Sequence, residues 1–384
     1  MAGHPGNATP RYTRGMHPRI ALTALLAAAL TACSTPPVRD SSAHSDLARH
    51  VATPEARLIP ETFVSAETAG EELDSLATWP TEDGRTWLIA SAKTSHRLLV
   101  LDGDSGALLR TFGEPGKGVG QFRRPNGVAV HGDLLFVVER DNHRVQVFTL
   151  PDFVPAGVFG GEQLRSPYGL WVDEVAPDEL EVYVTDSFMY GERFDVVPPF
   201  TELDQRVRRF RVVLPQGRPL QARYAGSFGD TRPDTALRMV ESIAGDPATR
   251  RLLIADEDRR HLSTLREYTF EGRYTGRQLP EASFGAEAEG IALWQCQGDS
   301  GYWIAVDQLA PRAVFHLFDR NTLKPAGSFR GEVTAYTDGI ALHAATTAAF
   351  PTGALFAVHD DKAVAAFDLQ EVARILNLSG DCTR

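Results

Sequence analysis

The chain has 384 residues, of which 43% are hydrophobic and 23% charged, so it can bury a large globular core. Its 39 Lys and Arg residues against 50 Asp and Glu residues give a formal net charge of −11. This acidic balance argues against a nucleic-acid partner. The 33 glycines and 24 prolines indicate many turns.

The N-terminus has the features of a targeting segment. Arg19 precedes an apolar run at residues 20–29 that is too short for a good membrane span. The run closes on Leu30-Thr31-Ala32-Cys33-Ser34, which resembles the lipobox of bacterial lipoproteins. The resemblance implies a lipid anchor on Cys33 in the bacterial cell envelope, and Ser34 favours the outer membrane. An ordinary cleaved signal peptide is the alternative, and Met16 is an alternative to Met1 as the start.

The rest of the chain carries a repeat. Six apolar runs mark its second strand, and their central residues are 48, 47, 70, 50 and 52 positions apart. An alternating third strand follows each run, at residues 97–102, 144–148, 206–212, 265–270, 314–319 and 363–368. Units of about 40–50 residues with four short strands are typical of a β-propeller. We therefore expect an all-β, six-bladed β-propeller.

The propeller has to close its ring. The last unit lacks an outer strand, and residues 57–65 form an orphan strand ahead of the first unit. We expect this segment to pair with the sixth blade, since closure protects the sheet edges. The domains are then a signal peptide (1–32), a lipidated cysteine with a flexible tether (33–56) and a propeller (57–384), which we expect to be a monomer. Ser187 to about Gln205 forms an insertion that we expect to be a loop on one face.

Two cysteines, Cys296 and Cys382, remain in the exported chain. Export permits a disulfide between them, which would tie the C-terminus to the fifth repeat. Two free, buried thiols are the alternative.

Polar residues recur at two fixed points of the repeat. The start of each innermost strand carries one of six residues: Asp74, Asn126, Tyr168, Glu241, Glu289 and Asp338. A second set follows the second strands: Lys93, Glu139, Asp186, Asp256, Glu257, Asp258, Asp307, Gln308, His359, Asp360 and Asp361. Short turns between the first and second strands place both sets at one mouth of the central channel.

So many carboxylates facing one cavity repel one another unless cations bind. Hard cations with oxygen ligands, Ca²⁺ above all, suit such a site, and no Cys/His cluster points to zinc. Nearby Lys and Arg side chains would suit a phosphorylated substrate. The alternative is that the acids cap strand ends or solvate the rim.

Motifs in the second half of the chain match a known pattern. They are Leu253-Ile254-Ala255-Asp256-Glu257-Asp258 after Glu241, Glu289-Gly290-Ile291-Ala292, Tyr302 to Gln308, and Thr337-Asp338-Gly339-Ile340-Ala341, with Asp74-Ser75-Leu76-Ala77-Thr78-Trp79 at the start. With these, the chain resembles the β-propeller phytases, calcium-dependent phosphatases that hydrolyse myo-inositol hexakisphosphate. The family pattern has Asp and Pro where this chain has Ser75 and Leu76, so this chain lacks one carboxylate of the first motif.

Roles follow from the resemblance and from the repeat positions. The resemblance implies catalytic roles for Glu241, Glu257 and Glu289, and phosphate binding by Lys93, Arg140 and Arg144. Together with the repeat, it gives these expected metal ligands: Asp74, Glu241, Asp256, Glu257, Asp258, Glu289, Asp307, Gln308, Asp338 and Asp360.

The first half of the chain resembles NHL repeats instead, from Gly116 to Val130 and from Asp141 to Phe148. NHL repeats specify a propeller blade and say little about activity. Two other functions therefore stay open. One is a non-enzymatic NHL-type binding or scaffold lipoprotein. The other is a gluconolactonase-like hydrolase, in which Glu139 or Glu241 with Asn126 and Asp338 would hold one divalent ion.

Overall fold

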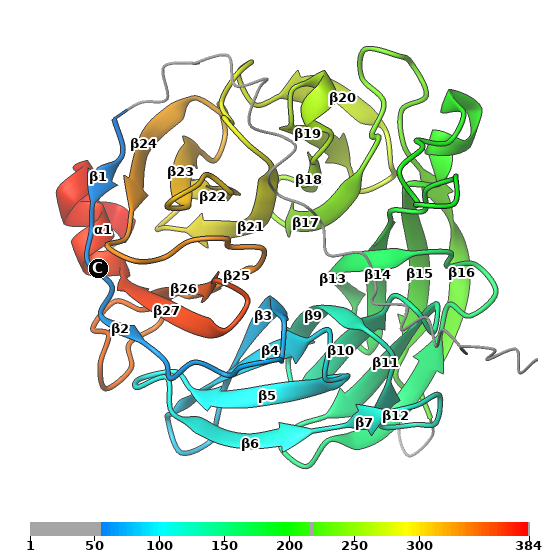
Figure 1. Cartoon of the computed structure of the whole chain (residues 1–384), viewed down its shortest axis with the longest axis horizontal. Helices are drawn as coiled ribbons and strands as arrows, with labels where there is room; N and C mark the ends of the chain where they lie inside the picture. The colour runs from blue at the N-terminus through cyan, green and yellow to red at the C-terminus, as the bar shows by residue number, and fades with distance from the viewer. Residues whose placement is uncertain (1–54, 216–218, 383–384) are drawn as a thin grey trace, which may run out of the picture. The chain divides into compact units, whose positions relative to one another are not determined.

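The computed structural model describes residues 55–215 and 219–382, and these form six antiparallel blades around a central axis (Figure 1). Blade 1 contains β3 (Leu73–Pro80), β4 (Thr86–Ala92), β5 (Arg97–Asp102) and β6 (Leu108–Phe112). Blade 2 contains β9 (Pro125–His131), β10 (Leu134–Glu139), β11 (Arg144–Thr149) and β12 (Val154–Phe159). Blade 3 contains β13 (Pro167–Ala176), β14 (Glu179–Asp186), β15 (Val207–Val213) and β16 (Gln221–Phe228). The sequence prediction of a six-bladed propeller is confirmed.

The other three blades continue the same up-and-down order. Blade 4 contains β17 (Val240–Asp246), β18 (Arg251–Asp256), β19 (Thr264–Thr269) and β20 (Tyr274–Gln278). Blade 5 contains β21 (Ala288–Gln295), β22 (Gly301–Asp307), β23 (Val314–Asp319) and β24 (Pro325–Arg330). Blade 6 contains β25 (Ile340–His343), β26 (Ala354–His359) and β27 (Ala363–Asp368). A small parallel pair, β7 (Glu114–Pro115) and β8 (Gln121–Phe122), lies in the connection before blade 2.

The hydrophobic core lies between neighbouring blades. One cluster, for example, packs Ala77, Ile89 and Leu98 of blade 1 against Val128 and Leu135 of blade 2. Both faces of the central strands are therefore buried, which explains why the second strands are continuous apolar runs in the sequence.

The N-terminal segment closes the ring as predicted. β2 (Phe63–Val64) pairs antiparallel with β27, so it supplies the outer strand that blade 6 lacks. β1 (Arg57–Leu58) was not predicted to be separate; it pairs in parallel with β24 on the edge of blade 5. The segment between them is fixed by Ile59, which is fully buried, and by Glu61, which accepts hydrogen bonds from the backbone N–H groups of residues 332–334.

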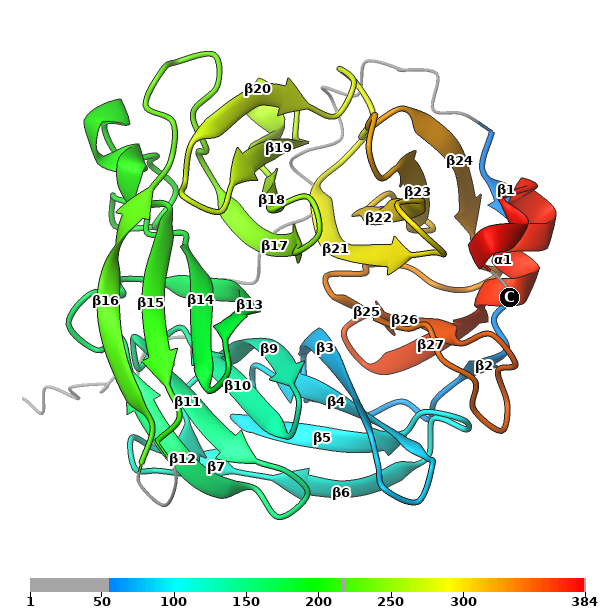
Figure 2. The same ribbon diagram turned by 180° about the vertical axis from the view of Figure 1, so that it is seen from behind.

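The C-terminus ends in a helix that the sequence pattern did not reveal. α1 (Leu369–Leu376) begins at Asp368, whose carboxylate accepts a hydrogen bond from the Gln370 N–H, and its buried face packs on β24 and β27. Figure 2 shows it beside β1 and β24. Cys296 and Cys382 form a disulfide with a Cα–Cα distance of 4.4 Å, so of the two alternatives the disulfide is the one present.

The predicted signal peptide, the lipidated Cys33 and most of the tether lie outside the described residues. In the part of the chain that the structure describes, no helix is long and apolar enough to cross a bilayer.

Candidate functional site

The innermost strands break their register at Asp74, Asn126, Tyr168, Glu241 and Glu289, which together with Asp338 are called the ring residues below. In β3, β9, β13, β17 and β21 the pairing with the next strand skips two residues, which are 74–75, 126–127, 168–169, 241–242 and 289–290. These β-bulges turn the first residue of each pair out of the ladder. The ring residues are thus presented by a repeated backbone irregularity at the end of the channel.

The residue after the ring residue is glycine in four blades, at positions 127, 169, 290 and 339, for a steric reason. A Cβ atom at Gly169 would overlap the carbonyl oxygen of Glu241 in the next blade, and one at Gly339 would overlap that of Asp74. In these four blades the adjacent inner strands approach so closely that a side chain would push the blades apart, whereas blades 1 and 4 accommodate the Cβ atoms of Ser75 and Ser242.

Three of the ring and strand-end acids form a tight cluster. Glu241, Glu257 and Glu289 each offer a carboxylate oxygen, and these oxygens lie within 4.8 Å of one another. Glu257 and Glu289 are buried, and Oε1 of Glu257 has no hydrogen-bond partner. Burial, and then the neighbouring Glu241 and Glu289 carboxylates, raise the pKa of Glu257 well above its usual value. Burial, followed by Asp338 and Glu241, raises the pKa of Glu289 in the same way.

On the other side of the ring, the positive charge of a lysine side chain lies among the carboxylates. The buried Lys93 ammonium lies 3.1 Å from Oδ2 of Asp338 and 3.8 Å from Oδ2 of Asp74. Asn126 donates a 2.8 Å hydrogen bond to Asp74, and Gln308 donates one of 2.6 Å to Asp338. Burial raises the pKa of Asp74 to about 6, although Lys93 opposes this shift. Burial alone would lower the pKa of Lys93, but Asp74 and Asp338 outweigh it and raise that pKa well above its usual value.

The acids at the strand ends proper have a different role. Each accepts hydrogen bonds from the backbone that enters its blade: Glu139 from the Arg123 N–H, Asp186 from Ser166, Asp256 from Met239, and Asp307 from Ala286. The capping alternative therefore describes Asp256 and Asp307, and the structure does not bring either residue into the glutamate cluster.

The residue that follows the end of the second strand directs its side chain to the mouth of the central channel in three blades. Lys93, Glu257 and Gln308 all occupy this position, and their backbone N–H groups bond to the carbonyl groups of Glu72, Met239 and Glu287. Because successive side chains in extended backbone point to opposite sides, the capping acid and the mouth residue alternate.

Two more predicted ligands lie elsewhere. Asp258 accepts bonds from the backbone and side chain of Arg260 at the start of the 3-10 turn Arg259–His261. Asp360 is half exposed and forms an ion pair with Lys362. Neither belongs to the glutamate cluster.

The predicted phosphate-binding residues also separate. Lys93 lies in the ring, whereas Arg144 bonds to the buried Glu139 and to the carbonyl groups of Lys117 and Gly118, so it fixes the connection before β9. Arg140 is paired with its neighbour Asp141 at the surface, 2.8 Å away.

Two residues near the mouth were not among the predicted site residues. Arg124 donates a 3.0 Å hydrogen bond to Glu72, and its buried Nε has no partner. Burial, followed by Asp338, raises the pKa of Asp361 to about 7. Asp361 belongs to the second set of repeat residues and Arg124 directly precedes Pro125-Asn126, so their positions in the repeat are the signal from which a site role could have been assigned.

The mouth opens into a channel along the propeller axis. This cavity measures about 570 Å³ and is lined by the inner strands, from Ser75 and Gly169 at the ring to His131 and Glu174 at the far end. Asp74, Tyr168, Glu241, Glu289 and Asp338 line a separate small cavity of about 20 Å³, which shares Ser75 and Gly169 with the channel.

Comparison with known proteins supports the architecture of the blades. The NHL repeat model matches residues 122–148, which contain β9, β10 and most of β11. No curated protein matches the chain.

Solved structures that match include a nidogen/laminin complex, with 16% identity over 72% of this chain and 87% of the matched chain, and a TM-score of 0.48. Another is a catalytically inactive variant of virginiamycin B lyase from Staphylococcus aureus with quinupristin. It has 10% identity over 79% of this chain and 98% of the matched chain, and a TM-score of 0.45.

Proposed function

We propose that this propeller is a calcium-dependent phosphomonoester hydrolase that acts on myo-inositol hexakisphosphate or a similar phosphorylated small molecule. The observation that carries the proposal is the cluster of Glu241, Glu257 and Glu289, which lies in the same ring as the buried Lys93. The resemblance of the surrounding motifs to β-propeller phytases points the same way.

The donor set fits calcium. Carboxylate and amide oxygens are the ligands that Ca²⁺ prefers. Oε1 of Glu257 is buried without a partner, and such an atom is costly unless a cation or water satisfies it. Glu241, Glu257 and Glu289 would hold the ion, with Asp338 and Gln308 beside them. When bound, calcium would supply the positive charge that attracts phosphate oxygens and stabilises charge in the transition state.

The chain's own residues would complete the chemistry. Lys93 provides a fixed ammonium on the opposite side of the ring, where it would orient a phosphate group. The raised pKa values of Glu257 and Glu289 belong to the metal-free cluster, where burial and neighbouring carboxylates disfavour their negative charges, and a bound cation would relieve that repulsion. Ser75 stands where the family pattern has Asp, so it offers no carboxylate for a further ion, and its N–H donates to the Ser91 hydroxyl.

The test is phosphate release from phytate by the purified protein with calcium, with EDTA, and with calcium added back. We expect release that EDTA abolishes and calcium restores, and a loss of at least about a hundredfold in Glu289→Ala. Calcium titration by calorimetry gives an independent reading of the same site. No release from phytate by the calcium-loaded protein would contradict the proposed substrate.

The NHL match at residues 122–148 favours one other function, a binding or scaffold propeller. Calcium binding without phosphate release from a panel of phosphomonoesters would support it. In the gluconolactonase-like hypothesis, Glu139 is no longer a candidate ligand for the divalent ion, because its carboxylate is already bonded to Arg144 and Gln146.

We also propose that the protein is anchored in the bacterial envelope through a lipid on Cys33, and that its substrate is a small soluble molecule. Metabolic labelling with palmitate would test the anchor. Label that persists in Cys33→Ser would contradict it.

A further inference from the structure

A buried hydroxyl group lies opposite the bulge in two of the six blades. The residue that faces the bulge is Ser91 in blade 1 and Thr185 in blade 3. Each accepts a hydrogen bond from the second bulge residue of its own blade: the Ser75 N–H at 3.0 Å and the Gly169 N–H at 2.8 Å. The hydroxyl thus replaces a bond that the bulge removes from the ladder.

The same hydroxyl groups reach the neighbouring blade. Ser91 donates a 2.5 Å hydrogen bond to the carbonyl oxygen of Asn126, and Thr185 donates one of 2.7 Å to that of Glu241. Thr185 also lies 3.3 Å from the carbonyl oxygen of Gly169, but a hydroxyl has one proton, and the shorter contact to Glu241 takes it. Both acceptors are ring residues.

The fold itself does not require a hydroxyl at this position. The equivalent residues in the other four blades are Val138, Ala255, Val306 and Val358, which have no polar side-chain atom. Blade 2 therefore forms the same bulge beside a valine. Formation of the blade therefore does not explain why Ser91 and Thr185 carry hydroxyl groups at this position.

We propose that Thr185 is a positioning residue for Glu241. It is fully buried between β13 and β17, and it joins the Gly169 bulge to the Glu241 backbone. The Glu241 carbonyl already lies so close to Gly169 that no Cβ fits between them. The hydroxyl holds this junction at one separation, and that separation sets how far the Glu241 carboxylate extends toward Glu257 and Glu289. The inference rests on the proposed calcium site.

The test compares three variants of the full chain. Thr185→Val keeps the shape of the side chain and removes the hydroxyl; Thr185→Ser keeps the hydroxyl. Thr264→Val is the matched control, because Thr264 is a buried threonine whose hydroxyl has no partner. Calcium affinity is measured by calorimetry, and folding by the thermal midpoint.

We expect Thr185→Val to weaken calcium binding about 10- to 100-fold, as loss of a supporting group does at metal sites, and Thr185→Ser to restore most of the affinity. Thr264→Val should bind calcium like the wild type. Equal calcium affinity in Thr185→Val and the wild type would overturn the inference while leaving the proposed function intact.

If the wild type itself binds no calcium, the proposed function fails. A crystal structure of Thr185→Val then tests separately whether Thr185 positions Glu241. The inference then expects the Glu241 carboxylate to move out of the 4.8 Å cluster. An unchanged cluster in that structure would overturn it.

Discussion

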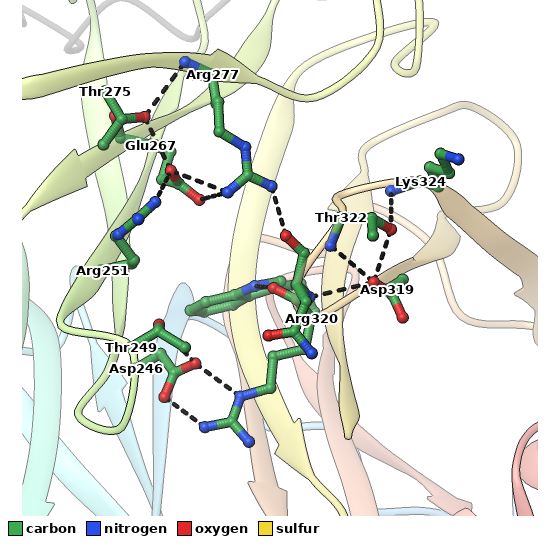
Figure 3. Close-up of polar contacts among 12 residues, drawn as sticks. Asp246, Thr249, Arg251, Glu267, Thr275, Arg277, Asp319, Arg320, Thr322 and Lys324 are labelled. Atoms are coloured by element: carbon green, nitrogen blue, oxygen red, sulfur yellow. Dashed lines mark hydrogen bonds and ion pairs between the residues drawn. The ribbon is translucent and has the colours of Figure 1, made fainter. Parts of the chain in front are cut away.

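Asp246 and Arg320 are 74 residues apart in the sequence, and they join blade 4 to blade 5 through two hydrogen bonds of 2.7 and 2.6 Å (Figure 3). Both side chains are almost fully buried, and Thr249 donates a further bond to Asp246. Burial alone would raise the pKa of Asp246, but the bonds from Arg320 and Thr249 outweigh it and lower that pKa. The carboxylate is therefore charged in the interface between the blades.

Loss of Arg320 should destabilise the propeller. Arg320→Met leaves the Asp246 carboxylate buried without its partner, and breaking such a pair costs about 3–5 kcal/mol. Urea unfolding measures the effect. Arg250→Met, which removes one partner of the exposed Arg250–Glu271 pair, is the control and should cost no more than about 1 kcal/mol. Similar losses in the two variants would show that the buried pair has no special role.

The stability of the metal-free protein should fall as the pH rises. Asp74, Asp361, Glu257 and Glu289 have folded-state pKa values above those of the unfolded chain, at about 6 and about 7 for the two aspartates. The folded state therefore binds more protons, and this contribution is complete below about pH 4. The part from Asp74 and Asp361 is lost as the pH rises through about 6 and about 7, and the part from Glu257 and Glu289 is lost at the higher pH where these two groups ionise.

Calcium should reduce that fall, because it replaces the protons among the carboxylates. Thermal midpoints measured from about pH 5 to about pH 8 with EDTA and with excess calcium give the comparison. A metal-free midpoint that rises over this range, or parallel curves with and without calcium, would contradict the prediction.

Lys93 should affect substrate affinity, whereas the other two predicted phosphate ligands should not. Lys93→Met removes the ammonium beside Asp74 and Asp338, so we expect the KM for phytate to rise about tenfold or more. Arg140→Met, at a half-exposed pair, should change KM little. Arg144→Met should lower the thermal midpoint, because Arg144 holds the backbone before β9. A KM effect confined to Arg140→Met would contradict this assignment.

The disulfide should stabilise the C-terminal end of the propeller. Cys296 and Cys382 are separated by 86 residues, and a cross-link over such a loop typically contributes about 2–4 kcal/mol. The double variant Cys296→Ser with Cys382→Ser should unfold at lower urea concentration than the wild type, and its free energy of unfolding should be lower by this amount. Wild-type protein under reducing conditions should match the double variant, and a midpoint unaffected by either change would argue against the tie.

The strands were predictable because burial on both faces leaves a strong apolar signal in each repeat. Residues 97–102, 314–319 and 363–368 coincide with β5, β23 and β27. α1 was missed because it has only eight residues. The strand at residues 57–65 was predicted, but its division into β1 and β2 was not, because two residues carry no periodicity. The pairing of β1 with β24 depends on contacts across the whole chain.

The site was only partly predictable for a different reason. The sequence reveals which acids follow each second strand, but it does not show that Asp256 turns inward to cap the backbone while Glu257 turns to the mouth. A shift of one residue reverses the direction of a side chain, so Asp307 and Gln308 divide in the same way. The bulges that place Glu241 and Glu289 are tertiary features with no sequence signal beyond the small residue beside them.

The ring closure also sets the order in which the molecule can be completed. Phe63 pairs with Ala366. The N-terminal end of the propeller, which leaves a ribosome or a secretion channel first, therefore finds its partner strand only when almost the whole chain has emerged. Until then blade 6 has an open edge, and open edges pair readily with other chains. A chain that stops before β27 therefore stays an open arc, and protection from aggregation comes only with the last strand.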